Sequence, residues 1–260
     1  MAAQTREAIG SEAIAKRALS LLRALDQQSK GTAISPVRLH RLRTDLRRLQ
    51  AWLDLVGQHA SATVLATQIT RLSPLRALQV FDQWLVRHQA RRSDLLKIRR
   101  LSKRAADEIR LKKCYSAIEE TIEKVTDWTP SLERMFNRTN WRRHQTASTR
   151  LLAAAREKPK RKRLHALRLH IKQLRYQIEW TPHPALHRVF LTQLRQAHRR
   201  LGIYEERAAF RKLAKQLKLK SRPHIVRSWR RARKRAHSLL QGMDWLLDSL
   251  DRLGNRLTGV

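Results

Sequence analysis

Apolar residues recur every three or four positions along most of the chain, which is the period of an amphipathic α-helix. The clearest example is a ridge in residues 36–57, made of Leu39, Leu42, Leu46, Leu49, Leu53 and Val56. A later segment repeats this ridge with Leu164, Leu167, Ile171, Leu174 and Ile178. Runs with the alternating period of a strand are absent, so the pattern predicts an all-α protein.

Proline, glycine and short polar runs divide the chain into eight predicted helices. The first four cover about 5–28, 36–57, 60–89 and 93–126, with a kink expected at Ser73–Pro74 in the third. The fifth follows the break at Pro130 and ends near 156; the sixth lies between EKPK (157–160) and TPHP (181–184). The last two cover about 185–219 and, from KSRP (220–223), to about 253. Short connectors between long helices predict bundle packing.

The two halves of the sequence resemble each other. A shift of 125 residues places Arg38, His40 and Arg43 on Arg163, His165 and Arg168, and a shift of 129 places 71–80 on 200–209. The repeat predicts one domain over 1–260, with a first repeat at about 5–126 and a second at about 130–253. The expected architecture is two four-helix bundles, related by internal duplication with pseudo-twofold symmetry and sharing one interface.

Basic residues line one side of each ridge, about 100° around the helix from it. The first basic row is His40, Arg43, Arg47 and Arg48; the second basic row is His165, Arg168, Lys172 and Arg175. Steps of three and four give one cation per turn, which suits a linear polymer with a negative charge on each unit. A solvated helix face is the alternative, but solvation requires no particular spacing, and both halves keep His, Arg and then Arg or Lys at the same offsets, up to Arg47 in the first row and Lys172 in the second.

Composition agrees with an anionic ligand. The chain has 57 Lys and Arg against 21 Asp and Glu, a net charge of +36. Such a surface attracts nucleic acid, acidic membrane or a phosphate polymer. Weaker candidate cations, for which a solvated face is an equal interpretation, are Lys97, Arg100, Arg104, Arg227, Arg231 and Lys234.

The residues of both rows resemble the signature of the CHAD family, the conserved-histidine α-helical domain. HALRLHIKQLRY (165–176) is similar to the H-x-x-R-x-x-x-R/K-x-L-R-Y pattern, and HRLRTDLRRLQ (40–50) is similar to its first-half counterpart. RRLGIYEERAA (199–209) resembles the family's third-helix motif, with Glu206 where Asp is common. The resemblance covers nearly the whole chain. It implies two four-helix bundles around a basic central cavity, non-catalytic binding of inorganic polyphosphate, and association with polyphosphate granules.

The first half departs from that family pattern. Gln50 replaces a usual arginine, and Ser73, Ala77 and Gln79 stand where glycine and acids are usual. We therefore expect the first half either to bind less strongly or to hold its third helix differently. The triphosphate-tunnel domain that many family members carry is not expected, since the Glu-x-Glu-x-Lys motif is missing.

Metal binding and catalysis fit the residues poorly, so we expect no metal, no cofactor and no enzymatic activity. His40 and His165 lack a Cys, Asp or Glu at ligand spacing and lie among cations that oppose a metal ion. Phosphoryl transfer needs carboxylates that hold magnesium. Asp244, Asp248 and Asp251 are remote in sequence from the rows, and a solvated helix face explains them better.

Nucleic-acid binding is the alternative function, because backbone charge alone does not distinguish DNA or RNA from polyphosphate. Trp141 and Trp229 lie among basic residues and could stack on bases. Trp52, Trp84, Trp229 and Trp245 also fit core positions, however, and no known nucleic-acid motif is evident.

The remaining features concern the cellular location of the protein. The single cysteine, Cys114, fits a reducing cytoplasm. The N-terminus reads as an amphipathic helix and not as a signal peptide, and no segment approaches the roughly 20 apolar residues of a membrane span. We expect a cytoplasmic protein located at polyphosphate granules.

Overall fold

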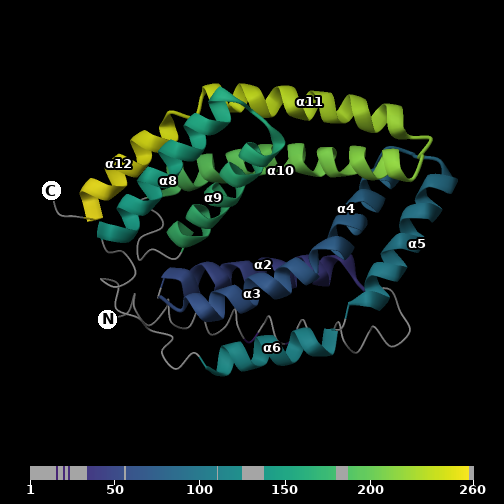
Figure 1. Ribbon diagram of the computed structural model, residues 1–260, viewed down its shortest axis with the longest axis horizontal. Helices are drawn as coiled ribbons and strands as arrows, with labels where there is room; N and C mark the ends of the chain where they lie inside the picture. Colours follow the sequence, from purple (N-terminus) through teal and green to yellow (C-terminus); the bar gives the residue numbers. More distant parts are fainter. Residues whose placement is uncertain are drawn as a thin grey trace. The chain divides into compact units, whose positions relative to one another are not determined.

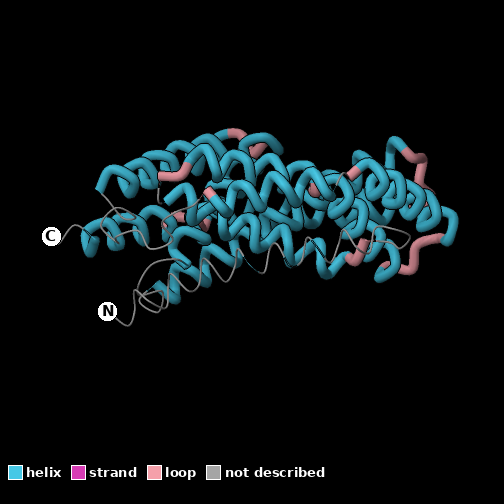
Figure 2. The backbone as a smooth tube through the Cα atoms, turned by 90° about the horizontal axis from the view of Figure 1, so that it is seen from below, coloured by secondary structure: helices cyan, strands magenta, loops and turns pink. Residues whose placement is uncertain are grey.

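The structure is a computed structural model that describes residues 16, 20, 23, 34–55, 57–109, 111–124, 138–179 and 187–257. The chain divides into two compact units, Met1–Pro130 and Ser131–Val260. Every regular element in the described part is a helix, and short loops join consecutive helices wherever the connecting residues are described (Figure 2). The predicted all-α class is therefore confirmed. The duplication that relates the two halves stays a prediction.

The first unit contains five described helices. They are α2 (Pro36–Leu55), α3 (His59–Arg71), α4 (Ser73–Arg87), α5 (Arg92–Glu108) and α6 (Leu111–Glu123). Helix α2 packs against α3 and α4, α4 packs against α5, and α3 packs against α6. Helix α2 carries the first basic row, so its neighbours α3 and α4 form the surroundings of that row.

The second unit also contains five described helices. They are α8 (Arg138–Glu157), α9 (Arg161–Glu179), α10 (Arg188–Gln216), α11 (Arg222–Gln241) and α12 (Trp245–Leu257). The long helix α10 packs against α9 and α11, and α8 packs against α9 and α12 (Figure 1). Helix α9, which carries the second basic row, therefore lies between α8 and α10.

The two leucine-rich ridges are buried as predicted. Leu39, Leu42, Leu46 and Leu49 of α2 are fully buried, and so are Leu164, Leu167, Ile171, Leu174 and Ile178 of α9. Val56 of the first ridge lies outside the described residues. Burying each of these side chains contributes roughly 1.5–3 kcal/mol. The ridges therefore fix the rotation of α2 and α9 about their own axes.

Three of the predicted long helices are interrupted. The expected kink at Ser73–Pro74 is a break at Leu72, where α3 ends and α4 begins. The fourth predicted helix breaks at Ile109, whose backbone is extended, although no glycine or proline marks the position. The eighth breaks where Gly242 ends α11, and the polar Asp244 precedes α12. Glycine is common just beyond a helix end, and here the sequence does carry a signal.

The described helices include none whose length and apolar character would let it cross a membrane.

A buried histidine pair lies between α8 and α9. His170 Nε2 is 2.7 Å from Oγ of the fully buried Ser148. The rings of His144 and His170 lie 5.7 Å apart. Burial lowers the pKa of each histidine from 6.5 to about 4. Both rings are therefore neutral in the folded protein near neutral pH.

This pair predicts that the protein loses stability in mild acid. Because the folded-state pKa values lie below the unfolded value of 6.5, the unfolded chain takes up protons first as the pH falls from 6.5 to about 4. The free energy of unfolding should fall by up to about 3 kcal/mol for each histidine across that window. Urea unfolding at several pH values measures it. His170→Gln should flatten the dependence, whereas replacing the exposed His224 with glutamine should not. An equally steep dependence in His170→Gln would contradict this account.

Candidate polyanion-binding site

The cations of the second basic row lie at the edge of a packed groove and not on a fully solvated face. Arg168 and Arg175 are half-buried, and Lys172 is only 8% exposed. His165, at the start of the row, is exposed. Because these residues flank the buried ridge of α9, the helices packed against α9 cover part of each side chain. This placement favours a role beyond solvation.

Arg168 lies against α10 at Gly202. A Cβ atom at Gly202 would be 3.4 Å from Nε and 3.7 Å from Nη2 of Arg168, so the absence of a side chain leaves room for the guanidinium. The Nε atom is buried and has no hydrogen-bond partner. Burial lowers the pKa of Arg168, and the nearby carboxylates of Glu205 and Glu206 oppose this effect. Arg168 is thus a cation that has lost water and keeps a donor without a protein acceptor.

The N-terminal end of the second basic row is held by a carboxylate from α10. Glu205 Oε2 lies 3.2 Å from Nε of Arg161 and 3.3 Å from Nδ1 of His165. The Glu205 side chain is 11% exposed. Its other oxygen, Oε1, is buried and has no hydrogen-bond partner. One carboxylate oxygen therefore serves two cationic or ionisable side chains of α9.

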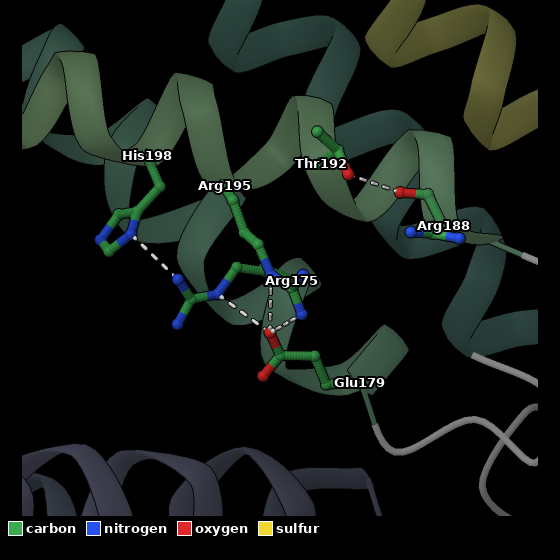
Figure 3. Close-up of polar contacts among 6 residues, drawn as sticks. All are labelled: Arg175, Glu179, Arg188, Thr192, Arg195 and His198. Carbon is green, nitrogen blue, oxygen red and sulfur yellow. Dashed lines mark hydrogen bonds and ion pairs between the residues drawn. The ribbon is translucent and has the colours of Figure 1, made fainter. Parts of the chain in front are cut away.

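The C-terminal end of the row is held by Glu179, the last residue of α9 (Figure 3). Its Oε1 accepts hydrogen bonds from Nη2 and Nε of Arg195 in α10, at 3.1 and 3.4 Å. The same oxygen is 3.7 Å from Nε of Arg175, one turn earlier in α9. Arg175 Nη1 is 3.4 Å from Nδ1 of His198, and its guanidinium lies over the ring of Tyr176. Arg175 is therefore fixed from several sides.

The side chains of the first basic row make different contacts from those of the second. Arg43 is 6% exposed, and it donates from Nη1 to the Leu72 carbonyl at 3.3 Å and from Nη2 to Ser73 Oγ at 3.0 Å. These bonds tie α2 to the junction of α3 and α4. Arg47 and Arg48 are half-buried. Partial burial, and after it the charges of Arg76, Arg47 and Arg43, lowers the pKa of His40. His40 is therefore neutral near pH 7, and an anion bound nearby would raise its pKa.

The two arginines that the sequence shift pairs with each other have different surroundings. Arg43 is bonded to Ser73, whereas Arg168 lies against Gly202, the residue that the second shift pairs with Ser73. Gln79, another departure of the first half, is buried and donates to the Ile34 carbonyl at 2.9 Å, while Ala77 is exposed. The polar replacements Ser73 and Gln79 thus connect elements of the first unit.

The weaker candidate cations lie at the surface. Lys97, Arg100 and Arg104 of α5 and Arg227, Arg231 and Lys234 of α11 are all exposed. The buried stripe of α11 consists of Ile225, Ala232, Ala236 and Leu240, whereas Val226, Trp229 and Leu239 are only partly buried. Arg211 lies over the ring of Trp229, 3.8 Å from its centroid. These surface cations carry charge without the fixed geometry of the second basic row.

The candidate stacking residues belong to the core. Trp141 is 5% exposed and donates from Nε1 to the Leu250 carbonyl at 2.9 Å. Trp52 and Trp84 are buried, and Trp229 and Trp245 pack against the core of the second unit. Base stacking on Trp141 is therefore incompatible with this packing, and a core role is confirmed for Trp52 and Trp84, whereas Trp229 and Trp245 are partly buried.

The carboxylates considered for catalysis have structural partners. Asp244 is 2.9 Å from Nη2 of Arg156, and Asp251 accepts a hydrogen bond from Gln145 Nε2 at 2.9 Å. These interactions connect the junction of α11 and α12, and the middle of α12, to α8. Among the described residues, no three His, Cys, Asp or Glu side chains are grouped as metal ligands.

Sequence reasoning missed Glu205, Arg195 and His198 as residues of this site, and it did not assign Gly202 a contact. Glu205 stands next to Glu206 in the third-helix motif, and that motif was the available signal. No sequence feature pairs Arg195 with Glu179, because that contact depends on the register between α9 and α10. The cavity predicted between the two halves stays a prediction.

Comparison with known proteins gives one similar fold. No protein-family model matches the chain, and no curated protein matches it. A solved structure, the CHAD domain from the plant Ricinus communis, superposes with a TM-score of 0.53 at 18% sequence identity. The match covers 96% of this chain and 92% of that one. The chain therefore has the fold of a CHAD domain.

Proposed function

We propose that this protein binds inorganic polyphosphate without catalysis, mainly through the second basic row on α9. The observation that carries the proposal is Arg168, a half-buried guanidinium whose buried Nε atom has no hydrogen-bond partner. Buried donors are nearly always paired in folded proteins. A donor left over at the edge of a groove, within a row of further cations, suits an anionic ligand.

The spacing of the row supports a linear polyanion. Arg168, Lys172 and Arg175 follow each other by four and three residues, so they lie about 5–6 Å apart along the helix axis. Arginine can donate two parallel hydrogen bonds to phosphate oxygens, and lysine contributes a compact charge. A polymer with one phosphate per unit can bond all three side chains at once, whereas a single phosphate ion can bond only one or two.

The fold agrees with this ligand class. The sequence resemblance to the CHAD family implies polyphosphate, and the superposition on a CHAD domain supports a related fold. The first basic row contributes less, because Arg43 already donates to Leu72 and Ser73. A protein of charge +36 that binds polyphosphate would collect on granules of that polymer.

Charge reversal within the second basic row tests the proposal. Arg168→Glu with Lys172→Glu should weaken polyphosphate binding more than about a hundredfold, because two charge-assisted contacts become repulsive. Titration of labelled polyphosphate measures the affinity, and circular dichroism checks that the helices persist. The matched control reverses Arg143 and Arg150, which are exposed on α8, and so makes the same change in net charge. If a folded double variant keeps the affinity, or the control loses as much, the assignment is wrong. Arg168→Gln with Lys172→Gln tests the same contacts if the reversed variant does not fold.

The contact between Arg168 and Gly202 gives an independent test. Gly202→Leu would fill the space that the guanidinium occupies, so polyphosphate affinity should fall by about tenfold or more, the value of a charged hydrogen bond. Gly202→Ala should change it little, since its Cβ would only reach van der Waals contact with Arg168. Gly242→Leu is the control, because no atom lies within 4 Å of a Cβ built there. Full affinity in a folded Gly202→Leu variant would show that the position of Arg168 does not matter.

A further inference from the structure

Carboxylates are scarce in this protein, yet they hold both ends of the second basic row. The sequence has 21 Asp and Glu for 57 Lys and Arg, so most cations cannot have a carboxylate of their own. Helix α11 carries six Arg and Lys residues in RSWRRARKR (227–235) without an acid. Glu205 and Glu179 are nevertheless placed at the first and last turns of α9. Their placement calls for an explanation beyond general charge balance.

Glu205 acts on the first turn of α9 from a largely covered position. Its Oε2 approaches Arg161 and His165 at 3.2 and 3.3 Å, while its buried Oε1 bonds to no group. Covering a carboxylate without filling all of its acceptor sites costs free energy. That cost is offset by the contacts of Glu205 with Arg161 and His165 of α9. These are side chains that a phosphate chain on the row would also use.

Glu179 acts in the same way on the last turn of α9. Its Oε1 is shared by Arg195 and Arg175, and its side chain is 19% exposed (Figure 3). Hydrogen-bonding nitrogens that already face a carboxylate oxygen are not open to a phosphate oxygen at the same point. Arg195 is hydrogen-bonded to Glu179, whereas the buried Arg175 Nε, 3.7 Å away, has no hydrogen-bond partner. An anion at this end therefore meets the repulsion of Glu179 at Arg175 and gains Arg195 only by displacing Glu179.

We infer that Glu179 and Glu205 are specificity-determining residues that compete with phosphate for the two ends of the second basic row. This inference rests on the proposed polyphosphate binding. A short anion can bond Arg168 and Lys172 in the middle of the row, but it gains the ends only by displacing a carboxylate. A long chain stays bound in the middle while its flanking phosphates displace both carboxylates, because those further steps are intramolecular. The two acids thereby favour long polymers over short phosphates.

The length of the second basic row determines which phosphate chains can reach both of its ends. From His165 to Arg175 the helix axis rises about 15 Å, since each residue adds about 1.5 Å. A triphosphate is too short to reach both ends of this row at once. Only a longer polymer meets Glu205 and Glu179 together, so only it should respond to removal of both.

The experiment is a titration of long-chain polyphosphate and of triphosphate against Glu179→Gln, Glu205→Gln and the double variant. Glutamine keeps the shape and removes the charge. Each single variant should bind the long chain about threefold to tenfold more tightly than the natural protein, and the two gains should multiply. Triphosphate should gain less than the long chain in the double variant. Glu157→Gln is the matched control. Glu157, the last residue of α8, pairs with Lys158 and with Arg163 of α9, neither of which belongs to the second basic row, and the substitution changes the net charge equally.

The outcomes separate the inference from the proposed function. If the natural protein does not bind polyphosphate, the proposed function is overturned and the inference with it. If the natural protein binds but the gains equal that of Glu157→Gln, net charge explains them and the inference alone is wrong. A loss of affinity in Glu179→Gln or Glu205→Gln would also overturn it, because the carboxylates would then orient the cations instead of competing with phosphate.

Discussion

Burial of the apolar ridge of α9 determines where the cations beside it lie. Leu164, Leu167, Ile171 and Leu174 are fully buried, so α9 cannot rotate without exposing them. The residues one position further along the sequence are then fixed at the rim of the groove, half-covered by the neighbouring helices. Arg168 and Lys172 lose part of their hydration as a consequence, and a partner with high negative charge can restore those lost interactions. The chemistry of the site follows from the packing of the helix.

The same packing acts differently in the two units. In the first, Arg43 bonds the junction of α3 and α4 and stabilises the fold there. In the second, Gly202 offers Arg168 no side-chain acceptor like Ser73, and carboxylates are found at the ends of the row instead. A hydroxymethyl side chain in place of a hydrogen atom thus distinguishes an arginine bonded within the fold from one whose guanidinium can serve a ligand. The net charge of +36 attracts polyanions to the whole surface, but the second basic row adds fixed geometry.

The sequence predicted the features that depend on local periodicity. Both ridges and the cations beside them follow directly from spacings of three and four, and the breaks at Ser73–Pro74 and at Gly242 had visible signals. The break at Ile109 had none, because the local sequence suits a continuous helix. The partners of the cations could not be predicted either. The contacts of Glu205 with His165 and of Arg195 with Glu179 depend on the axial register between α9 and α10. Periodicity fixes which face a residue occupies and says nothing of that register.

The most direct test of polyphosphate binding is a competition titration at near-physiological salt. A labelled long-chain polyphosphate bound to the protein is displaced by unlabelled polyphosphate, single-stranded RNA or duplex DNA at matched phosphate concentration. We expect polyphosphate to compete better than either nucleic acid by orders of magnitude, because the second basic row offers closely spaced donors to a thin, flexible chain. Equal competition by all three would contradict the account. The protein would then bind polyanions through its net charge alone, as a nucleic-acid-binding protein does.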